Sequence, residues 1–364
     1  MKKIYRKINN YCTLPSMIAY LIFFAAVIIH IMFCLSVPFA DFFNRYISSV
    51  IRMILAKLTG WFPYSIAELI LLSVPLLLVL LLIFAYKISD SKRAMIRYVI
   101  AFVSVITLFY STFVLGFASG YQGSALEDKL GMDRRDVSAE ELYYTADILL
   151  GEAGRLAARV DFIYGSSSVM PYDSKEMNRI LNGAYEKLSN DHDFLPLLKS
   201  NLKQILLSEP MTYTHISGVY TYYTGEANIN INFPDYTIVF TAAHELAHQR
   251  GIAREDEANF MAFLVCLASD DVYANYCAYI NMYEYVANAL YTADRELYMS
   301  LLSKMDKRVR GEIVTYNNFF DKYKESKVSN VSAAINDTFL KSQGQSEGMK
   351  SYGRVVDLAV AYYR

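Results

Sequence analysis

The chain has 364 residues, a length typical of roughly two or three folded units, and carries 35 basic and 36 acidic side chains for a net charge of −1. Because there is no basic excess, the composition argues against a broad nucleic-acid-binding surface, and we expect no nucleic-acid partner. The apolar residues are concentrated in the first third, so the sequence predicts a membrane part followed by a water-exposed part.

Three apolar segments are long enough to cross a lipid bilayer as helices, namely 17–37, 69–86 and 98–117. None of them contains Asp, Glu, Lys or Arg. At about 1.5 Å per residue each spans roughly 27–32 Å, which matches the hydrocarbon core. The first follows a basic N-terminus, as a signal peptide does. Its apolar stretch exceeds the usual length, however, and no small-residue cleavage site follows, so we expect an uncleaved anchor.

Basic residues predict how these helices are oriented in the membrane. Four precede the first helix and four lie between the second and third, whereas residues 118–128 carry none. We therefore expect the N-terminus and the 87–97 loop in the cytoplasm, and the loop 38–68 and all residues after 117 outside it. The loop 38–68 is expected to include an interfacial helix, with Trp61 near the membrane surface.

Residues 118–364 are long enough for one domain with a sizeable core. Capping sequences at Ser138 and Asp173 predict helices over 139–160 and 174–189. After the central motif described below, the chain is expected to be helical almost to its end. Polar sequence within that region predicts loops or short helices at 321–332 and 341–348.

The strand-like sequence of this domain lies in two neighbouring runs, 212–224 and 227–233. The first is rich in Thr, Tyr, Val and Ile, and the second alternates between Asn and apolar residues. Gly225 between them indicates a turn, and Pro234 ends the second run. A helix is then predicted over 237–249.

That helix contains the sequence His244-Glu245-Leu246-Ala247-His248. Two histidines four positions apart share one helix face, roughly 6 Å from each other, so together they can hold one Zn²⁺ ion. The glutamate between them can take a proton from a water at the metal, which makes Glu245 the candidate catalytic residue. Because no cysteine cluster lies nearby, we expect a catalytic site with three protein ligands rather than a closed structural one.

The third ligand is expected from acidic residues just after Gly251, where the helix should end and the chain should turn back. The spacing HExxHxxG also begins the metzincin pattern, but Arg254 stands where that pattern needs His or Asp, so we set it aside. The run 255–259 instead resembles the E-x-x-A-N pattern of glutamate-zincins. On this resemblance Glu255 is the third ligand and Glu257 the alternative. Asn259 is expected to hydrogen-bond a ligand histidine.

The resemblance to zincins implies two further features. A Tyr or His often stabilises the oxyanion in such enzymes, and the candidates are Tyr352, Tyr223 and His215. An edge strand above the metal binds the extended peptide through backbone hydrogen bonds, and the candidate is 227–233.

The longer string HELAHQRGIAREDEANF, with three helices before it and the segment 351–357 after it, resembles an uncharacterised family of bacterial membrane proteins. That family carries a domain of unknown function and is similar in its motif to glutamate-zincin metallopeptidases. The resemblance implies a mainly α multi-pass protein of the bacterial plasma membrane. Residues 1–117 would form the membrane domain, and 118–364 an α+β zincin-like extracytoplasmic domain with a small sheet.

These observations predict a membrane-anchored zinc metallopeptidase that hydrolyses peptide bonds of a peptide or protein substrate outside the cytoplasm. Two alternatives stay open, a zinc amidase acting on cell-wall peptide and a non-enzymatic envelope scaffold or sensor. An intact Glu245 disfavours the scaffold, which has no need of a base. An intramembrane protease is disfavoured because the motif follows polar strand sequence and precedes a charged run. The sequence does not predict an oligomeric state.

Overall fold

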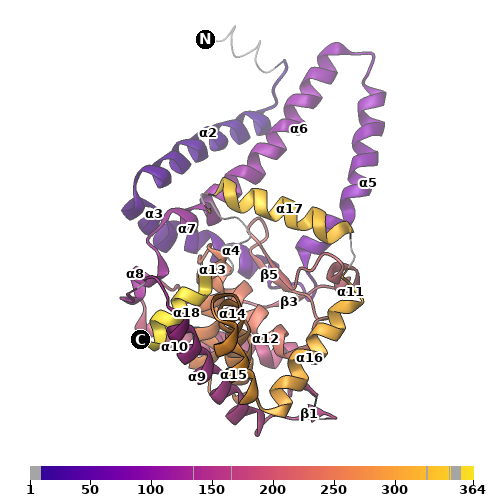
Figure 1. The fold of residues 1–364 in the computed structure, drawn as a ribbon. Coiled ribbons are helices and arrows are strands. Elements are labelled where there is room, and N and C mark those ends of the chain that lie inside the picture. The colour runs from indigo at the N-terminus through magenta and orange to yellow at the C-terminus, as the bar shows by residue number, and fades with distance from the viewer. Residues whose placement is uncertain (1–9, 134, 165, 325–326, 344, 346–353) are drawn as a thin grey trace. The chain divides into compact units, whose positions relative to one another are not determined.

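The computed structural model describes residues 10–133, 135–164, 166–324, 327–343, 345 and 354–364 (Figure 1). The described residues are mostly helical, with a small three-stranded sheet and a short two-stranded hairpin. They form two compact units, which are described separately below. The first unit comprises Met1–Gly123 with Thr221–Gly225, and the second comprises Ser124–Tyr220 with Glu226–Arg364.

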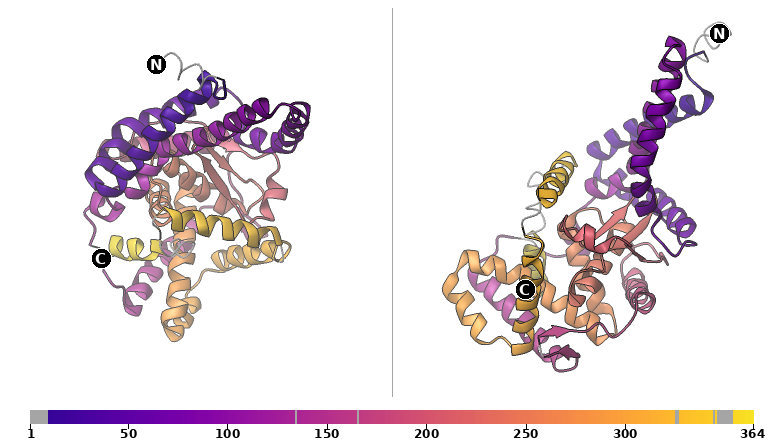
Figure 2. Two further views of the ribbon diagram at one scale, coloured as in Figure 1. Left: turned by 90° about the horizontal axis from the view of Figure 1, so that it is seen from above. Right: turned by 90° about the vertical axis from the view of Figure 1, so that its right-hand side faces the viewer.

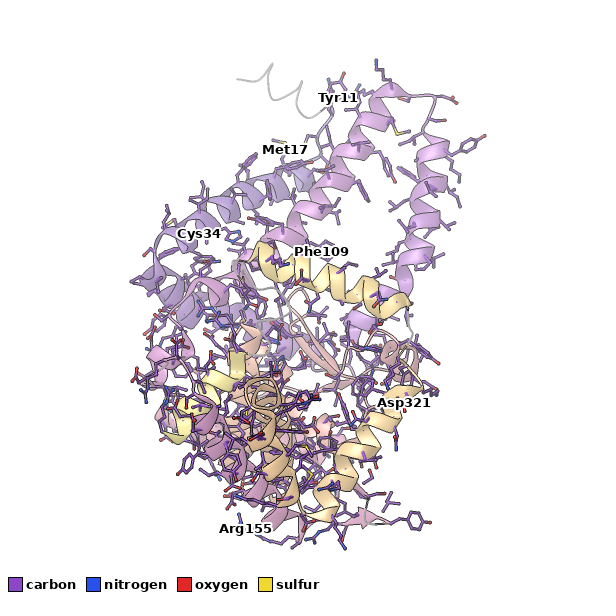
Figure 3. The ribbon with its side chains drawn as sticks, viewed as in Figure 1. Tyr11, Met17, Cys34, Phe109, Arg155 and Asp321 are labelled. Atoms are coloured by element: carbon purple, nitrogen blue, oxygen red, sulfur yellow. The ribbon has the colours of Figure 1, made fainter. Side chains whose placement is uncertain are left out.

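The first unit contains three helices that are long and apolar enough to cross a membrane, one on each predicted segment (Figure 1). Their outer surfaces carry apolar side chains such as Phe109, which is labelled in Figure 3. The third helix continues through a π-helical turn to Gln122, so the domain boundary expected at residue 117 lies inside a continuous helix. The elements are α2 (Leu14–Leu35), α5 (Ile66–Lys87), α6 (Lys92–Phe113), η2 (Val114–Ala118) and α7 (Ser119–Gln122).

Helices α2 and α6 pack against each other, and three polar contacts join them. The Tyr20 hydroxyl donates to the carbonyl oxygen of Ile100 over 2.8 Å, and the Ser104 hydroxyl lies 3.2 Å from that of Ser16. Nδ1 of His30 lies 2.8 Å from the Tyr110 hydroxyl. Such contacts can hold two apolar helices together where lipid offers no competing hydrogen-bond partner.

The loop between the first two long helices is itself helical, with α3 (Val37–Phe43), the π-helical η1 (Asn44–Ser48) and α4 (Ser49–Thr59). Arg52 of α4 is only 1% exposed and donates to the carbonyl oxygen of Gly116 and the side chain of Asn44. It therefore ties η1 to η2. These buried hydrogen bonds give Arg52 a structural role within the first unit.

In the second unit, both helices predicted from capping sequences are confirmed as α9 and α10. The Ser138 hydroxyl accepts from the Glu141 backbone while the Glu141 carboxylate accepts from the Ser138 backbone, and this reciprocal pair fixes the start of α9. Buried residues of α9 and α14 lie in the main hydrophobic core. The helices that precede the motif are α8 (Leu126–Leu130), α9 (Ala139–Ala157), α10 (Ser174–Asp191) and α11 (Ser208–Thr212).

The strands are shorter than the sequence predicts. The hairpin strands β1 (Phe162–Ile163) and β2 (Ser167–Ser168) are antiparallel. The sheet contains β3 (Lys203–Gln204), β4 (Gly218–Thr221) and β5 (Glu226–Ile229) in the order β3-β5-β4, with β3 parallel to β5. The predicted turn is present, because Gly225 has a φ of +70° and its N–H donates to the carbonyl oxygen of Thr221.

The asparagines of the second run explain why β5 stops early. Asn228 and Asn230 are each 1% exposed, so the Asn face of the run is buried. The Asn230 amide donates to Thr212 and to the Ile216 carbonyl oxygen, and its side-chain oxygen accepts from the Asn232 backbone. This local turn bends the chain out of the sheet.

The prediction that 227–233 forms a substrate-binding edge strand is wrong. β5 lies between β3 and β4, so both of its edges already pair with neighbouring strands. An added peptide strand needs a free row of backbone groups, which β5 does not offer. β4 lies at an edge of the sheet.

From residue 235 onward the described residues are nearly all helical, as the sequence predicts. The main difference lies at 327–332, which belongs to the sixteen-residue helix α17 although the sequence predicts a loop or short helix there. The elements are α12 (Asp235–Gln249), α13 (Glu255–Ala268), α14 (Val272–Ala293), α15 (Arg295–Ser303), α16 (Lys307–Asp321), α17 (Lys327–Ser342) and α18 (Val355–Tyr363).

Candidate metal centre

The turn between α12 and α13 brings the histidines and the acidic cluster together. Helix α12 ends at Gln249, and Gly251 follows with a φ of +94°, a left-handed conformation that favours glycine. The N–H of Ile252 donates back to the carbonyl oxygen of Ala247, which closes the helix end. The chain therefore reverses within a few residues, and α13 starts beside α12 at Glu255.

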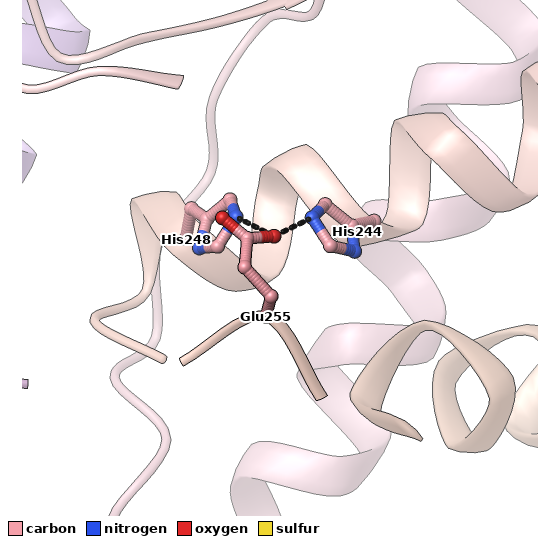
Figure 4. Close-up of side chains that lie close together, drawn as sticks. All are labelled: His244, His248 and Glu255. Atoms are coloured by element: carbon pink, nitrogen blue, oxygen red, sulfur yellow. Dashed lines mark ion pairs between the residues drawn. The ribbon is translucent and has the colours of Figure 1, made fainter. Parts of the chain in front are cut away.

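Three side chains converge at this turn, His244 and His248 from α12 and Glu255 from the first turn of α13 (Figure 4). Each offers one ligand atom, and these atoms all lie within 4.8 Å of one another. Oε2 of Glu255 is 3.2 Å from Nε2 of His244 and 3.5 Å from Nε2 of His248. Two imidazole nitrogens and one carboxylate oxygen are a ligand set that suits catalytic zinc.

The rear nitrogen of each histidine is held by a fixed acceptor. Nδ1 of His244 donates to Oδ1 of Asn259 over 2.8 Å, and Nδ1 of His248 donates to the carbonyl oxygen of Ile252 over 2.7 Å. Because these oxygens accept, the Nδ1 atoms carry protons and the Nε2 atoms are available to a metal. Asn259 thus makes the contact that the E-x-x-A-N resemblance implies for it.

The charges within the cluster are strongly coupled. Burial opposes a charged His248, but the nearby Glu255 carboxylate outweighs burial and raises the pKa of His248 to about 9. Burial would raise the pKa of Glu255, yet His248 and His244 hold it well below its ordinary value. A divalent cation would replace the His248 proton as the counter-charge of Glu255.

Glu245 lies beside this cluster without joining it. Its side chain is 4% exposed, burial raises its pKa, and the backbone N–H of Tyr220 donates to its carboxylate. Its second oxygen, Oε2, is buried and has no hydrogen-bond partner among the described residues. A buried carboxylate oxygen without a partner is costly in a finished fold, so it marks a place for a further group.

Strand β4 passes directly over Glu245. A Cβ atom added to Gly218 would lie 2.6 Å from Oε1 of Glu245 and 2.7 Å from Cγ2 of Thr241. Glycine is therefore the residue that lets the β4 backbone approach the glutamate so closely. No local sequence signal identifies Gly218, because only the folded sheet brings it beside the motif.

Two buried contacts fix the position of α12. The Tyr185 hydroxyl donates to the carbonyl oxygen of Ala243 over 2.7 Å, one residue before His244. The Arg250 guanidinium stacks 3.9 Å above the Tyr185 ring and donates to the carbonyl oxygen of Leu198. The sequence does not predict these roles of Tyr185 and Arg250, because their partners Ala243 and Leu198 are distant along the chain.

The remaining candidate residues lie elsewhere or outside the described residues. Glu257, the alternative ligand, pairs with Nη1 of Arg254 at 2.9 Å and accepts from the Leu126 backbone, so it is engaged away from the cluster. Nε2 of His215 donates to the carbonyl oxygen of Tyr323. Tyr223 belongs to the turn assigned to the first unit, where it packs edge-on against Phe109. Tyr352 lies outside the described residues.

Comparison with known proteins gives one family match. A family model described as "Protein of unknown function (DUF3810)" matches residues 43–360. The matched range includes α12, α13 and the 351–357 segment, and it begins after α2. No curated protein and no solved structure matches the chain.

Proposed function

The chain belongs to the family described as a protein of unknown function (DUF3810), and from its own site we propose that it is a membrane-anchored, zinc-dependent metallopeptidase. One observation carries this proposal. A compact group of two histidines and a glutamate lies beside a buried glutamate, Glu245, that has an oxygen without a partner among the described residues. The first three suit a metal, and the fourth suits a base.

In this proposal His244, His248 and Glu255 hold the zinc ion. When bound, zinc supplies a Lewis acid that acidifies water and polarises a carbonyl group. Glu245 takes the proton from the attacking water and later gives it to the leaving amine. Its raised pKa favours this exchange, because a base that is less acidic than an exposed carboxylate holds the proton more readily. Asn259 keeps the His244 ring turned with Nε2 toward the metal.

We further propose that β4, rather than β5, is the strand along which an extended peptide substrate lies. It is at the sheet edge, and its residue Gly218 approaches Glu245. A substrate strand paired there would bring its carbonyl groups to the proposed base. A non-enzymatic scaffold has no need of this close approach, so the fit between Gly218 and Glu245 favours an enzyme.

The proposed activity can be tested with the full-length protein in lipid nanodiscs and a library of unstructured peptides, with new N-termini identified by mass spectrometry. We expect cleavage that a zinc chelator abolishes and that added Zn²⁺ restores. Cleavage that persists after the metal has been removed would rule out the zinc mechanism. A library left intact by a zinc-loaded, folded protein would point to the scaffold or sensor.

The site is also proposed to face the extracytoplasmic side of the bacterial plasma membrane. Four basic residues lie at the end of α5 and the start of α6, and residues 118–128 carry none, which supports this orientation. Alkaline phosphatase fused after residue 125 should be active in cells, because that enzyme requires export. If this fusion is inactive while a green fluorescent protein fused at the same position is fluorescent, the second unit lies in the cytoplasm instead.

A further inference from the structure

Helix α17 carries large apolar side chains on its exposed side. Val328, Val331, Ile335 and Phe339 are 56%, 60%, 67% and 37% exposed. Their spacing of three and then four residues places them along one side of the helix. Ala334 and Thr338 are exposed as well, and neither is charged. Residues 328, 331, 334, 335, 338 and 339 form what we call the apolar face, and the exposed side of α17 also includes Asn330, Lys341 and Ser342.

The inward side of α17 is mostly polar. Ser329 is 8% exposed, while Asn336 and Asp337 are half-buried together with the fully buried Leu340. A helix on the surface of a water-soluble domain normally turns its apolar side inward and its polar side outward. In α17 most large apolar side chains instead point outward, with Leu340 as the buried exception, and in Figures 1 and 2 the helix extends beyond the packed helices of the second unit. The apolar face therefore suits an apolar environment rather than water.

Further exposed apolar residues lie near the start of α17. Leu206 and Leu207 are 76% and 44% exposed, and they directly precede α11. Tyr213, which follows α11, packs at 4.9 Å against the ring of Tyr323, a few residues before α17. The exposed Ile231 is joined to α11 through a hydrogen bond from its backbone to Ser208.

We propose that the apolar face of α17 rests on the lipid bilayer as an interfacial helix. Within the described residues three helices are suited to cross that bilayer, and the third runs as one helix to Gln122, directly before the second unit begins at Ser124. So short a connection keeps the second unit close to the lipid surface, where even a modest apolar face stays in contact. This inference does not depend on the proposed peptidase activity.

The composition of the apolar face distinguishes lipid from a protein partner. Protein interfaces are enriched in Tyr, Trp, Phe, Met and Arg, and the residues that dominate their binding energy are mostly Trp, Tyr and Arg and seldom Val. The apolar face holds Val, Ile, Ala and Phe with a single hydroxyl, so it offers area but almost no hydrogen-bonding specificity. That is the chemistry of a helix face that enters the acyl-chain boundary.

The test attaches an environment-sensitive NBD fluorophore to Ile335→Cys, and separately to Asn330→Cys, in the full-length chain. Asn330 is also exposed and lies roughly 140° around the helix from Ile335, so it serves as the matched control. The background is Cys12→Ser with Cys34→Ala, while Cys266 and Cys277 are fully buried and stay. The protein is reconstituted in vesicles of three parts phosphatidylcholine to one part phosphatidylglycerol. Some of the lipids carry a doxyl quencher near the headgroup end of the acyl chain.

We expect the label at 335 to emit at shorter wavelength than the label at 330, and to be quenched several-fold more strongly by the doxyl lipids. Equal, water-like emission and weak quenching at both positions would overturn the proposal. Short-wavelength emission at 335 without lipid quenching would overturn it as well, because protein would then cover the face. Labelling Val331→Cys repeats the measurement on the same face, so a single poorly folded variant does not decide the outcome.

Discussion

Replacing Glu245 with glutamine is expected to slow peptide hydrolysis by about 10²- to 10⁴-fold while leaving the bound zinc in place. Glutamine has nearly the shape of glutamate but cannot accept and return a proton. Glu245 does not belong to the group of side chains that could hold a metal, so its loss should leave the ligands intact. Single-turnover cleavage of a peptide selected from the library, measured beside metal content, separates these two effects.

The matched control for this variant is Glu186→Gln. The Glu186 side chain is 51% exposed, so the same chemical change there should alter neither rate nor stability. Glu245→Gln is also expected to be at least as stable as the wild type, because it removes a carboxylate from a buried place. If the glutamine variant keeps its activity, Glu245 is not the base.

Replacing Gly218 with alanine is expected to be nearly as damaging. The added methyl group would meet Oε1 and Cγ of Glu245 at 2.6 Å and 2.7 Å, and either the glutamate or the β4 backbone must move. A displacement of about 1 Å at a reacting group can reduce the rate roughly 10²-fold. Overpacking of this kind should also lower the free energy of unfolding by about 1–3 kcal/mol. Activity assays and thermal denaturation of the same preparation measure both.

Gly151 and Gly183 provide the controls for that change. Both lie inside helices, and an added Cβ would meet nothing within 4 Å. Alanine at either position should leave hydrolysis unchanged and stabilise its helix by up to about 1 kcal/mol. A fully active Gly218→Ala variant would show that β4 does not lie over the base, and would remove the main argument for β4 as the substrate strand.

Local signals explain the parts of the fold that the sequence predicts well. Unbroken apolar segments predict the long helices of the first unit, and a complete capping box at Ser138 fixes the start of α9. Gly251 predicts the helix end that returns the chain to Glu255, since few other residues accept a left-handed conformation. The grouping of His244, His248 and Glu255 follows from helical spacing plus that one turn.

Other features depend on contacts between distant segments, which no local pattern contains. The alternation in 227–233 is typical of a half-exposed strand. Asn228 and Asn230 are nevertheless buried, because their side-chain amides donate hydrogen bonds to backbone carbonyl groups of the adjacent segment 216–219. The order of strands, and so which edge is free, depends on β3 pairing beside β5. The role of Gly218 depends in turn on that order. The sequence misses the start of α17, 327–332, because Ser and Asn dilute its apolar residues.

The central claim is that His244, His248 and Glu255 form a zinc site, and metal analysis of the purified full-length protein tests it most directly. Elemental mass spectrometry should find about one zinc per chain in the wild type. The zinc should be lost in His244→Ala and retained in His215→Ala, whose imidazole is engaged with Tyr323 instead. A folded wild-type protein that holds no zinc, even after dialysis against Zn²⁺, would contradict the account.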